Sequence, residues 1–481
     1  MIMKRPGPIL SFAFTCIAIF FCCNSSTFTN NPDTWTRADS ILNEITEPVF
    51  PDTVFSIIDF GAVPDGRTLN TLAINNTIIH ASESGGGMVL IPEGTFLTGA
   101  IHLKSNVKLF LHDSAIVNFS VNPADYLPVV ITRWEGMDCY NYSPLIYGYD
   151  LENIAITGKG KLNGQADNQN WWPWKGQTFY GWKQGMPSQL DPECRPLLMN
   201  FNNNNVPVEE RKMGEGHYLR PPFIQLYKCK NILLQDFTIE NSPFWVIHPL
   251  ISENITIREI RVNSSGPNND GCDPESCKNL KIENCHFNTG DDCIAFKSGR
   301  NADGRRWNIP TEDVVVRNCR MENGHGGIVI GSEISGGCRN IFVEDCEMSS
   351  PELDRAIRIK TNSQRGGIIE NINARNINVG QVNETVIKIN CRYEPEEGTG
   401  NYPPLIQNIR LSEITSRKAR YAIVILGIKD LVCINNVYIS DCEFSGVTKD
   451  MIIQDAGSIF LDRITINGKL IEDLSVQNET K

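Results

Sequence analysis

The sequence lacks an excess of basic residues, and beyond its N-terminus it lacks any long apolar run. Its 44 Lys and Arg residues are outnumbered by 56 Asp and Glu residues, which gives a formal net charge of −12. This balance disfavours nucleic acid as a partner, and an acidic substrate would need a local basic patch. Because a membrane-spanning helix takes about 20 apolar residues, the sequence predicts a soluble mature chain without a membrane span.

A metal-binding signature is also missing, because no Cys-x-x-Cys pair stands beside a second His or Cys pair. We therefore expect no metal site. Thirteen cysteines follow residue 23, and their placement predicts free, buried thiols that pack as small apolar groups. Four of them share one position of a recurring segment: Cys285, Cys319, Cys346 and Cys442. Disulfides are the alternative, since stacked segments bring their Cα atoms within bonding range.

The N-terminus has the pattern of an export signal. Two basic residues precede an apolar run over residues 9–23, and small polar residues follow. Residues 1–23 are therefore predicted to be a signal peptide that directs the chain to the periplasm or the exterior. Lipidation at Cys22 or Cys23, as in an outer-membrane lipoprotein, is the alternative to simple cleavage. The Ser-, Thr- and Asn-rich residues 24–50 predict a flexible lead-in.

Strand-like segments recur from about residue 54 to the C-terminus. Four of them are NITIREIRVNS (Asn254), NLKIENCHFNT (Asn279), DVVVRNCRMEN (Asp313) and NIFVEDCEMSS (Asn340). Each alternates apolar with polar residues, which is the period of a strand with one face inward. Units of about 23 to 34 residues without helices between them indicate a solenoid of β coils. We therefore predict an all-β, single-domain solenoid over residues 54–481.

Two segments depart from the repeat. Residues 71–84 have the pattern of an amphipathic helix that ends at a run of three glycines. We expect this helix to cover the first coil, whose open strand edge would otherwise invite aggregation. A long irregular insertion at about residues 133–219 is rich in Trp, Tyr, Gly and Pro. It is predicted to wall a substrate cleft, and packing against the outside of the coils is the alternative.

Charged residues recur at matching points of the four segments. Counted from each segment's first residue, the offsets are +16 for Asp270, +12 for Asp291, +13 for Asp292, +12 for His325, +18 for Arg358 and +20 for Lys360. If each segment is one coil, these side chains stack at roughly 4.7–4.9 Å. A solvated turn or strand face would explain any one of them alone. Their coincidence favours a cleft.

Carboxylates at this spacing suit acid–base hydrolysis of a glycosidic bond. One acid protonates the leaving oxygen and another carboxylate activates water, and crowding pushes their pKa values apart. Asp291 and Asp292 would normally face opposite ways, and a bulge or turn at Gly290 would bring both to the cleft. A carboxyl separation of about 6.5–9.5 Å across the coils would imply inversion. Neighbouring cations fit an anionic sugar, with Arg358 as a bidentate partner for its carboxylate.

The motifs themselves are more specific. PNNDGCDPES (267–276), GDDCIAFKSGRNADGRR (290–306), GHGGIVIGSE (324–333) and RIKTNSQRGG (358–367) occur in this order. Together they resemble the signature of glycoside hydrolase family 28, the polygalacturonases that degrade pectin. The family's patterns are Asn-Thr-Asp, Gly-Asp-Asp, Gly-His-Gly and Arg-Ile-Lys, and the resemblance spans the chain from about residue 54 onward. Asn269 replaces the usual Thr of the first pattern, a mild departure because the Asp is kept.

The resemblance implies a right-handed parallel β-helix and inverting hydrolysis of α-1,4-galacturonosyl bonds without a metal or other cofactor. It makes Asp291 the general acid, lets Asp270 and Asp292 hold and activate water, and lets His325 tune the acid. The substrate-binding residues that it implies are Arg358, Lys360, Asn268, Arg300 and Tyr393.

We therefore expect an exported, exo-acting polygalacturonase whose partner is pectin or an oligogalacturonide. The aromatic insertion resembles the exo-acting bacterial branch, because a wall there would close one end of the groove. A rhamnogalacturonan hydrolase of the same family is the nearest alternative. A Ca²⁺-dependent pectate-type lyase and a non-catalytic sugar-binding protein are alternatives from other classes.

Overall fold

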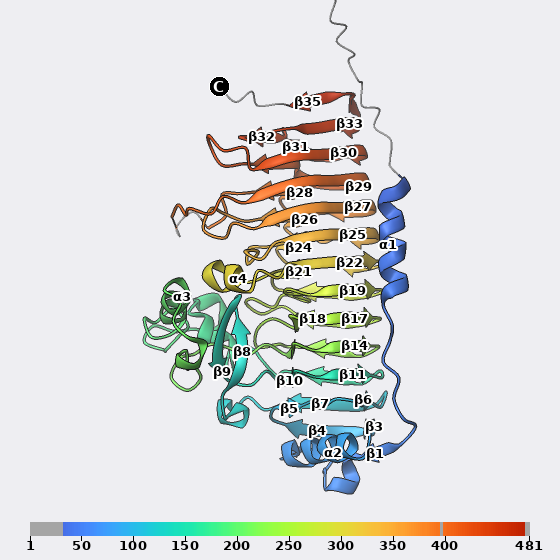
Figure 1. Cartoon of the computed structure of the whole chain (residues 1–481), viewed down its shortest axis with the longest axis vertical. Helices are drawn as coiled ribbons and strands as arrows, with labels where there is room; N and C mark the ends of the chain where they lie inside the picture. The colour runs from blue at the N-terminus through green and yellow to red at the C-terminus, as the bar shows by residue number, and fades with distance from the viewer. Residues whose placement is uncertain (1–31, 395–397, 477–481) are drawn as a thin grey trace, which may run out of the picture.

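Alternating strands stack coil upon coil into a right-handed parallel β-helix (Figure 1). The computed structural model describes residues 32–394 and 398–476. The predicted signal peptide and the first residues of the lead-in lie outside this range. Three columns of strands form the three faces of the coil, and the prediction of an all-β solenoid is confirmed.

The first column is the longest and carries the segment openings that defined the repeat. Its parallel strands are β1 (Val54–Ser56), β3 (Gly87–Ile91), β6 (Val107–Leu111), β11 (Glu152–Thr157), β14 (Lys230–Gln235), β17 (Glu253–Arg258), β19 (Lys278–Glu283), β22 (Thr311–Arg317), β25 (Cys338–Met348), β27 (Ile368–Gln381), β29 (Leu405–Leu426), β30 (Ile434–Phe444) and β33 (Ile459–Ile466).

The second column consists of shorter strands that merge with the first at β25. They are β2 (Asp65–Leu69), β4 (Gly94–Thr98), β7 (Ala115–Phe119), β12 (Lys161–Asn163), β15 (Thr238–Glu240), β18 (Arg261–Ser264), β20 (His286–Thr289) and β23 (Arg320–Met321).

The third column is made of short strands that isolated bridges at Cys272 link into a continuous face. Its strands are β5 (Ile101–His102), β10 (Ile146–Tyr149), β13 (Ile224–Tyr227), β16 (Ile247–Leu250), β21 (Asp292–Phe296), β24 (Gly326–Ile330), β26 (Arg355–Lys360) and β28 (Thr385–Asn390), followed by the end of β29, β31 (Val447–Lys449) and β32 (Ile452–Gln454). All the predicted acids lie on or beside this column.

The core runs along the inside of the coils, where inward residues of one coil register with those of the next. In the first column Ile255 pairs with Leu280, Leu280 with Val314, and Val314 with Ile341, and all four are buried. The thirteen cysteines from Cys139 to Cys442 are free and buried, which confirms the prediction of packed thiols.

Asparagines and one aspartate form a ladder near the start of the first-column strands from β6 to β30. Asn254, Asn279, Asp313 and Asn340 all have positive φ values between 52° and 58°, a conformation that Asn and Asp tolerate better than other side chains. Asn340 Nδ2 donates to Asp313 Oδ1 at 3.0 Å, and Asn371 Nδ2 donates to Asn340 Oδ1 at 3.2 Å. The recurring Asn or Asp therefore stabilises the turn and connects adjacent coils.

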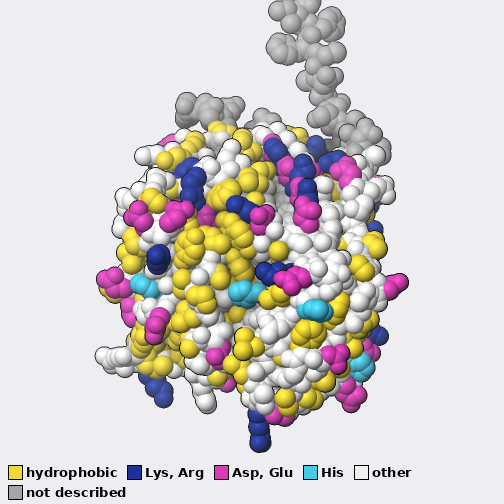
Figure 2. Space-filling model, turned by 60° about the horizontal axis from the view of Figure 1, so that its bottom comes forward, with side chains coloured by type: hydrophobic (Ala, Val, Ile, Leu, Met, Phe, Trp, Pro, Cys, Tyr) yellow, Lys and Arg dark blue, Asp and Glu magenta, His cyan; other side chains and the backbone are white. Residues whose placement is uncertain are grey.

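Helix α2 (Thr71–Glu83) covers the N-terminal end of the stack, as predicted for residues 71–84. It buries Ile74 and Ile78 against the first coil and leaves Leu72 exposed. Figure 2 shows this end of the molecule, where apolar side chains are interspersed with charged and other polar groups.

Helix α1 (Pro32–Glu44) lies where the sequence predicted a flexible lead-in. It packs lengthwise against the outside of β19 and β22 in the first column, on the side opposite the insertion (Figure 1). Ala38 and Ile41 are buried with Val315 and Phe342 of the sheet. The lead-in prediction fails for residues 32–44 because the polar composition concealed an apolar stripe at helical spacing.

The irregular segment predicted at residues 133–219 is not continuous. Residues 146–163 contain β10, β11 and β12, which form one regular coil. On one side of it lies the antiparallel hairpin of β8 (Val130–Trp134) and β9 (Met137–Asn141). On the other side, residues 164–223 contain α3 (Arg195–Asn203) and short 3-10 turns, among them η3 (Trp172–Lys175). Both parts pack on the same side of the stack, near α4 (Asn301–Trp307) (Figure 1).

The C-terminal end of the stack is covered by two antiparallel strands. Strands β34 (Lys469–Ile471) and β35 (Leu474–Val476) fold back onto β33, whose edge would otherwise be open. No helix in the described part of the chain is long and apolar enough to cross a membrane.

Candidate active site

The third column brings the three predicted acids together. Asp292 begins β21 and pairs in register with Gly326 of β24. Asp270 precedes Cys272 by two residues, just as Asp292 precedes Ile294, and Cys272 bridges Ile294. One oxygen from each of Asp270, Asp291 and Asp292 lies within 4.8 Å of the others. Residues from two coils thus share one cluster.

A bend at Gly290 turns both adjacent aspartates towards this cluster. A Cβ at Gly290 would lie 2.2 Å from the carbonyl oxygen of Gly266, so only glycine fits at the bend. Asp291 Oδ1 accepts a hydrogen bond from the backbone N–H of Asp292 at 3.0 Å. The turn that the sequence argument required at Gly290 is therefore present.

His325 lies directly beside Asp291. Its Nδ1 is 2.9 Å from Asp291 Oδ1, and its backbone N–H donates to the Asp291 carbonyl oxygen at 3.1 Å. The negative charge of Asp291 and this hydrogen bond raise the pKa of His325 to about 9. His325 is thus an imidazolium at neutral pH, with half of its side chain exposed.

The cations of the Arg-Ile-Lys motif converge on Asp292. Lys360 Nζ lies 2.6 Å from Asp292 Oδ2, and Arg358 NH1 lies 3.7 Å from Asp292 Oδ1. Both cations also lie over the ring of Tyr393, at 5.2 and 5.3 Å from its centroid. The structure therefore brings Arg358, Lys360 and Tyr393 to the acids as the sequence predicted.

Asn268 and Arg300 also line the cavity, but both are already engaged by protein groups. Asn268 Oδ1 accepts from Lys175 Nζ at 2.8 Å. The almost wholly buried Arg300 forms ion pairs with Glu333 at 3.2 Å and with Glu394 at 3.4 Å. These contacts make Arg300 part of the cavity wall, and its direct contact with substrate remains a prediction.

Sequence reasoning missed Lys297, a further buried cation of this site. Its Nζ lies 3.4 Å from Asp270 Oδ2, 3.4 Å from Asp273 Oδ1 and 3.3 Å from Glu333 Oε2, and 4.4 Å from the centroid of the Trp245 ring. Lys297 stands inside the Gly-Asp-Asp motif run. Arg358 and Lys360 lie two residues apart on one strand face, and across the coils Lys297 is in register with Lys360. This shared register could have identified Lys297 from the sequence.

The side chains around the three carboxyls determine where a proton resides. Burial and the negative charge of Asp291 raise the pKa of Asp270 to about 7. Burial also opposes ionisation of Asp291, but the charge and hydrogen bond of His325 outweigh it and hold the Asp291 pKa well below its usual range. Asp270 therefore binds a proton more readily than Asp291 does, and the proton nearest to Asp291 is that of His325.

The spacing of the carboxyls differs from the expectation. Their nearest oxygens lie within 4.8 Å, closer than the separation of about 6.5–9.5 Å that usually accompanies inversion. Three clustered carboxylates also resemble the oxygen ligands of Ca²⁺. Here, however, Lys297, Lys360 and Arg358 already supply positive charge to them. A divalent cation would have to compete with these ion pairs.

The cluster opens into a cavity of about 350 Å³ that the insertion helps to enclose. The hairpin contributes Glu135, and the segment after β12 contributes Lys175, Gln177, Gln189, Leu190 and Arg195. The predicted wall is therefore present. Other insertion residues pack inward, since Trp134 stacks on Phe244 with ring centroids 5.0 Å apart.

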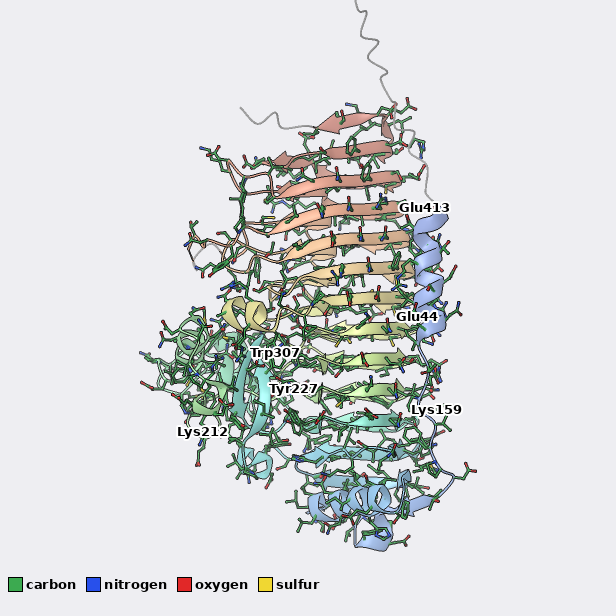
Figure 3. All side chains as sticks on the ribbon, viewed as in Figure 1. Glu44, Lys159, Lys212, Tyr227, Trp307 and Glu413 are labelled. Carbon is green, nitrogen blue, oxygen red and sulfur yellow. The ribbon has the colours of Figure 1, made fainter. Side chains whose placement is uncertain are left out.

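A network of buried polar groups holds the hairpin against the coils. Asp138 of β9 accepts hydrogen bonds from Arg133 Nε at 2.7 Å and from Trp307 Nε1 at 2.6 Å. Tyr227 of β13 donates to the same carboxylate at 3.3 Å. Figure 3 shows Trp307 and Tyr227 where the hairpin meets the coils. The wall of the cavity is thus fixed to the scaffold that carries the acids.

Known proteins resemble this chain over most of its length. The model of the glycosyl hydrolases family 28 matches residues 199–458, and a rhamnogalacturonase A/epimerase, pectate lyase-like model matches residues 54–110. A probable polygalacturonase of Vitis vinifera is 31% identical over 404 residues, which cover 80% of this chain and 74% of that protein. An exo-poly-alpha-D-galacturonosidase of Dickeya chrysanthemi is 26% identical and covers 75% of this chain, whereas the match spans 61% of that protein.

Solved structures show the same similarity in three dimensions. A hyperthermoactive exopolygalacturonase from Thermotoga maritima superposes with a TM-score of 0.89 at 43% identity, covering 92% of this chain and 98% of that one. A family 28 exopolygalacturonase from Yersinia enterocolitica superposes with a TM-score of 0.68 at 22% identity, covering 87% and 76%.

Proposed function

The chain belongs to glycosyl hydrolase family 28, and from this premise we propose that it is an exo-acting polygalacturonase that hydrolyses galacturonan chains from one end. The observation that carries the proposal is the cluster of Asp270, Asp291 and Asp292, with cations beside it in a partly enclosed cavity. Similarity to solved exopolygalacturonases supports the reaction class, and the wall built by the insertion supports action at a chain end.

Each group of the cluster has a role that its contacts support. Asp291 lines the cavity and shares a hydrogen bond with the charged His325, so this pair can deliver a proton to the leaving glycosidic oxygen. Asp292 Oδ1 has no hydrogen-bond partner among the described residues, so it can accept a hydrogen bond from the attacking water. Asp270, when it is ionised, can hold the same water and accept a proton from that water.

The distribution of products tests the mode of attack. Defined galacturonate oligomers should yield only single sugar residues shed from one terminus, measured by chromatography over time. A mixture of lengths at early times would mean attack within the chain. The anomeric configuration of the first product, followed by NMR, tests inversion independently of the carboxyl spacing.

The variant Asp291→Asn tests the acid. Its kcat on trigalacturonate should fall by at least about 100-fold, because general acid catalysis contributes that much or more. Circular dichroism should show an intact fold. An Asp291→Asn protein with full activity would refute the assignment.

Two competing functions predict different results. A rhamnogalacturonan hydrolase, to which the match over residues 54–110 draws attention, would act on rhamnogalacturonan rather than on galacturonate oligomers. A pectate-type lyase would lose activity in EDTA and would release unsaturated products that absorb ultraviolet light. We expect EDTA-resistant hydrolysis without such absorbance.

We also propose that the chain is exported and acts in the periplasm or outside the cell. The apolar run and flanking residues of the first 23 positions support this. Fractionation of the source cells, with mass measurement of the mature N-terminus, distinguishes cleavage from lipidation at Cys22 or Cys23.

A further inference from the structure

One cation in the cavity differs from the others in what surrounds it. Arg195, Lys297, Arg300 and Lys360 each lie within 4 Å of a carboxylate: Glu135, Asp270, Glu333 and Asp292, respectively. Lys175 forms no such ion pair with any residue that the structure describes. Its Nζ donates to the neutral oxygen Asn268 Oδ1 at 2.8 Å. The charge of Lys175 is therefore left for another anion.

A second cation behind Lys175 reinforces this imbalance. Arg220 is completely buried, and its NH2 donates to the same Asn268 Oδ1 at 2.9 Å. Its other acceptors are also neutral: the carbonyl oxygens of Pro243 and Pro267 and the amide oxygen of Gln189. Within residues 32–394 and 398–476, no carboxylate forms an ion pair with Arg220. Burial lowers the pKa of Arg220 to about 9.

Two neighbouring cations that no described carboxylate contacts directly are costly to bury, because Glu135 and Asp291 act on them only from a distance. Burial and the charge of Arg220 also lower the pKa of Lys175. An anion bound at Lys175 would relieve both effects. The side chain lines the cavity that contains Asp270 and Asp291, so this anion would lie in the same cavity as the reacting bond.

The segment around Lys175 is held rigidly enough to place the charge. Trp172 Nε1 donates to the Ser242 carbonyl oxygen at 2.9 Å. A Cβ at Gly266 would lie 2.2 Å from the Trp172 ring, so the indole packs directly on the coil backbone. Trp174 packs against Trp171 with ring centroids 4.9 Å apart. Lys175 is thus fixed at the end of η3.

We propose that Lys175, positioned by Asn268, binds the carboxylate of the terminal galacturonate in the cavity and makes the enzyme selective for an unesterified chain end. This inference rests on the proposed function. It adds to the Arg-Ile-Lys motif a carboxylate-binding residue that the insertion contributes, whereas Lys360 of the motif is already paired with Asp292.

An alternative role for Lys175 must be separated from this one. Its charge also helps to hold the Asp291 pKa low, so it could act through Asp291 without touching substrate. Substrate esterification distinguishes the two roles, because a methyl ester removes the anion that Lys175 would bind and leaves Asp291 unchanged.

The experiment compares wild type with Lys175→Met on trigalacturonate and on two trigalacturonates, each methyl-esterified at one terminal unit. On the free acid, kcat/KM should fall about 10- to 100-fold, mainly through KM. On one of the two esters, the kcat/KM of wild type should fall by a similar factor. The kcat/KM of Lys175→Met on that ester should lie little below its value on the free acid. Lys175→Arg should recover part of the activity. Lys183→Met, an exposed substitution in the same insertion, should match wild type.

An equal loss in Lys175→Met on all three substrates would overturn the inference and leave the proposed function standing. A wild-type protein that is inactive on every galacturonate oligomer would overturn both. A thermal melt of Lys175→Met that matches wild type shows that any loss comes from the site rather than from misfolding.

Discussion

At the scale of single residues, three carboxyls compete for protons within a span of 4.8 Å. Asp291 has a charged histidine for a partner, whereas Asp270 shares the charge of Lys297 with Asp273 and Glu333 and lies deeper in the protein. Their environments therefore separate two groups of the same chemistry into an ionised carboxylate and a carboxyl that keeps its proton near neutrality.

The titration of His325 reports on this arrangement. In wild type its pKa should lie near 9, because Asp291 stabilises the imidazolium. In Asp291→Asn it should fall to about 6.5 or lower, since the stabilising charge is gone. NMR of protein carrying ¹⁵N-labelled histidine measures both values. His286, on the second column, serves as the internal control and should titrate alike in both proteins. An unchanged His325 titration in Asp291→Asn would contradict the pairing.

The protonation of Asp270 should also appear in the pH dependence of stability. Because its folded pKa is raised to about 7, the folded state binds more protons than the unfolded state between about pH 4 and 7. Asp270 therefore destabilises the fold increasingly as pH rises through this range. Asp270→Asn should raise the free energy of unfolding more at pH 8 than at pH 4.5, by up to roughly 3 kcal/mol.

Denaturant unfolding at the two pH values measures this difference. Asp113→Asn, which alters an exposed carboxyl on the surface, is the matched control and should show no such dependence. If Asp270→Asn raised the free energy of unfolding equally at both pH values, or more at pH 4.5, the result would contradict the raised pKa of Asp270.

The sequence predicted the motif residues because they repeat at fixed offsets, and coils in register bring such positions together. Lys175 and Glu135 could not be found in this way. They lie in the insertion, where no repeat relates one position to another, and nothing in their neighbours marks which side chain faces the cavity. Only the contacts of Trp172 and of the hairpin determine this.

At the scale of elements, strand alternation predicted the first column well because one face of each strand is buried in the coil. The apolar run Val314-Val315-Val316 in β22 departs from this alternation. Its outward residue, Val315, is buried by α1. A strand that is apolar on both faces indicates that another element covers its outer face. The run does not identify residues 32–44 as that element.

The packing of α1 can be tested at Trp35. Its ring lies 5.6 Å from that of Phe342, and the guanidinium of Arg375 lies 3.8 Å from its centroid. Trp35→Ala should reduce the free energy of unfolding by roughly 2–3 kcal/mol through lost apolar and cation–π contacts. Urea denaturation measures the loss. Hydrolysis at 25 °C should be unaffected, since α1 lies on the side opposite the insertion.

Asp39→Ala, an exposed change on the same helix, provides the control and should alter stability by less than about 0.5 kcal/mol. If Trp35→Ala were as stable as wild type, the contacts of Trp35 with Phe342 and Arg375 would contribute nothing to stability.

At the scale of the whole molecule, a stack of coils has two open ends where unpaired strand edges can recruit other chains. Helix α2 protects one end, and the antiparallel strands β34 and β35 protect the other. The sequence predicted the first of these covers from its helical pattern. Strands β34 and β35 have the same alternation as the other strands, so the sequence did not reveal that they run antiparallel to β33.

Removal of residues 469–481 should therefore expose the edge of β33 and cause self-association. We expect light scattering and size-exclusion chromatography to show larger species at micromolar concentration. A control chain that ends at Val476 keeps both strands and should elute like the full-length protein. A truncated chain that elutes like this control would show that β34 and β35 are dispensable as a cover.

The lengthwise placement of α1 has a mechanical consequence. In a stack of repeats that contact only their neighbours, unfolding can proceed from either end one coil at a time. Helix α1 contacts β22 through Arg37 and Asp313 at 2.9 Å and reaches β27 through Arg375. The helix thus links the middle coils into one block that unfolds cooperatively. That block includes the coil that carries Asp291 and Asp292, which opens with β19, so unfolding that starts at a terminus should stall before it reaches that coil.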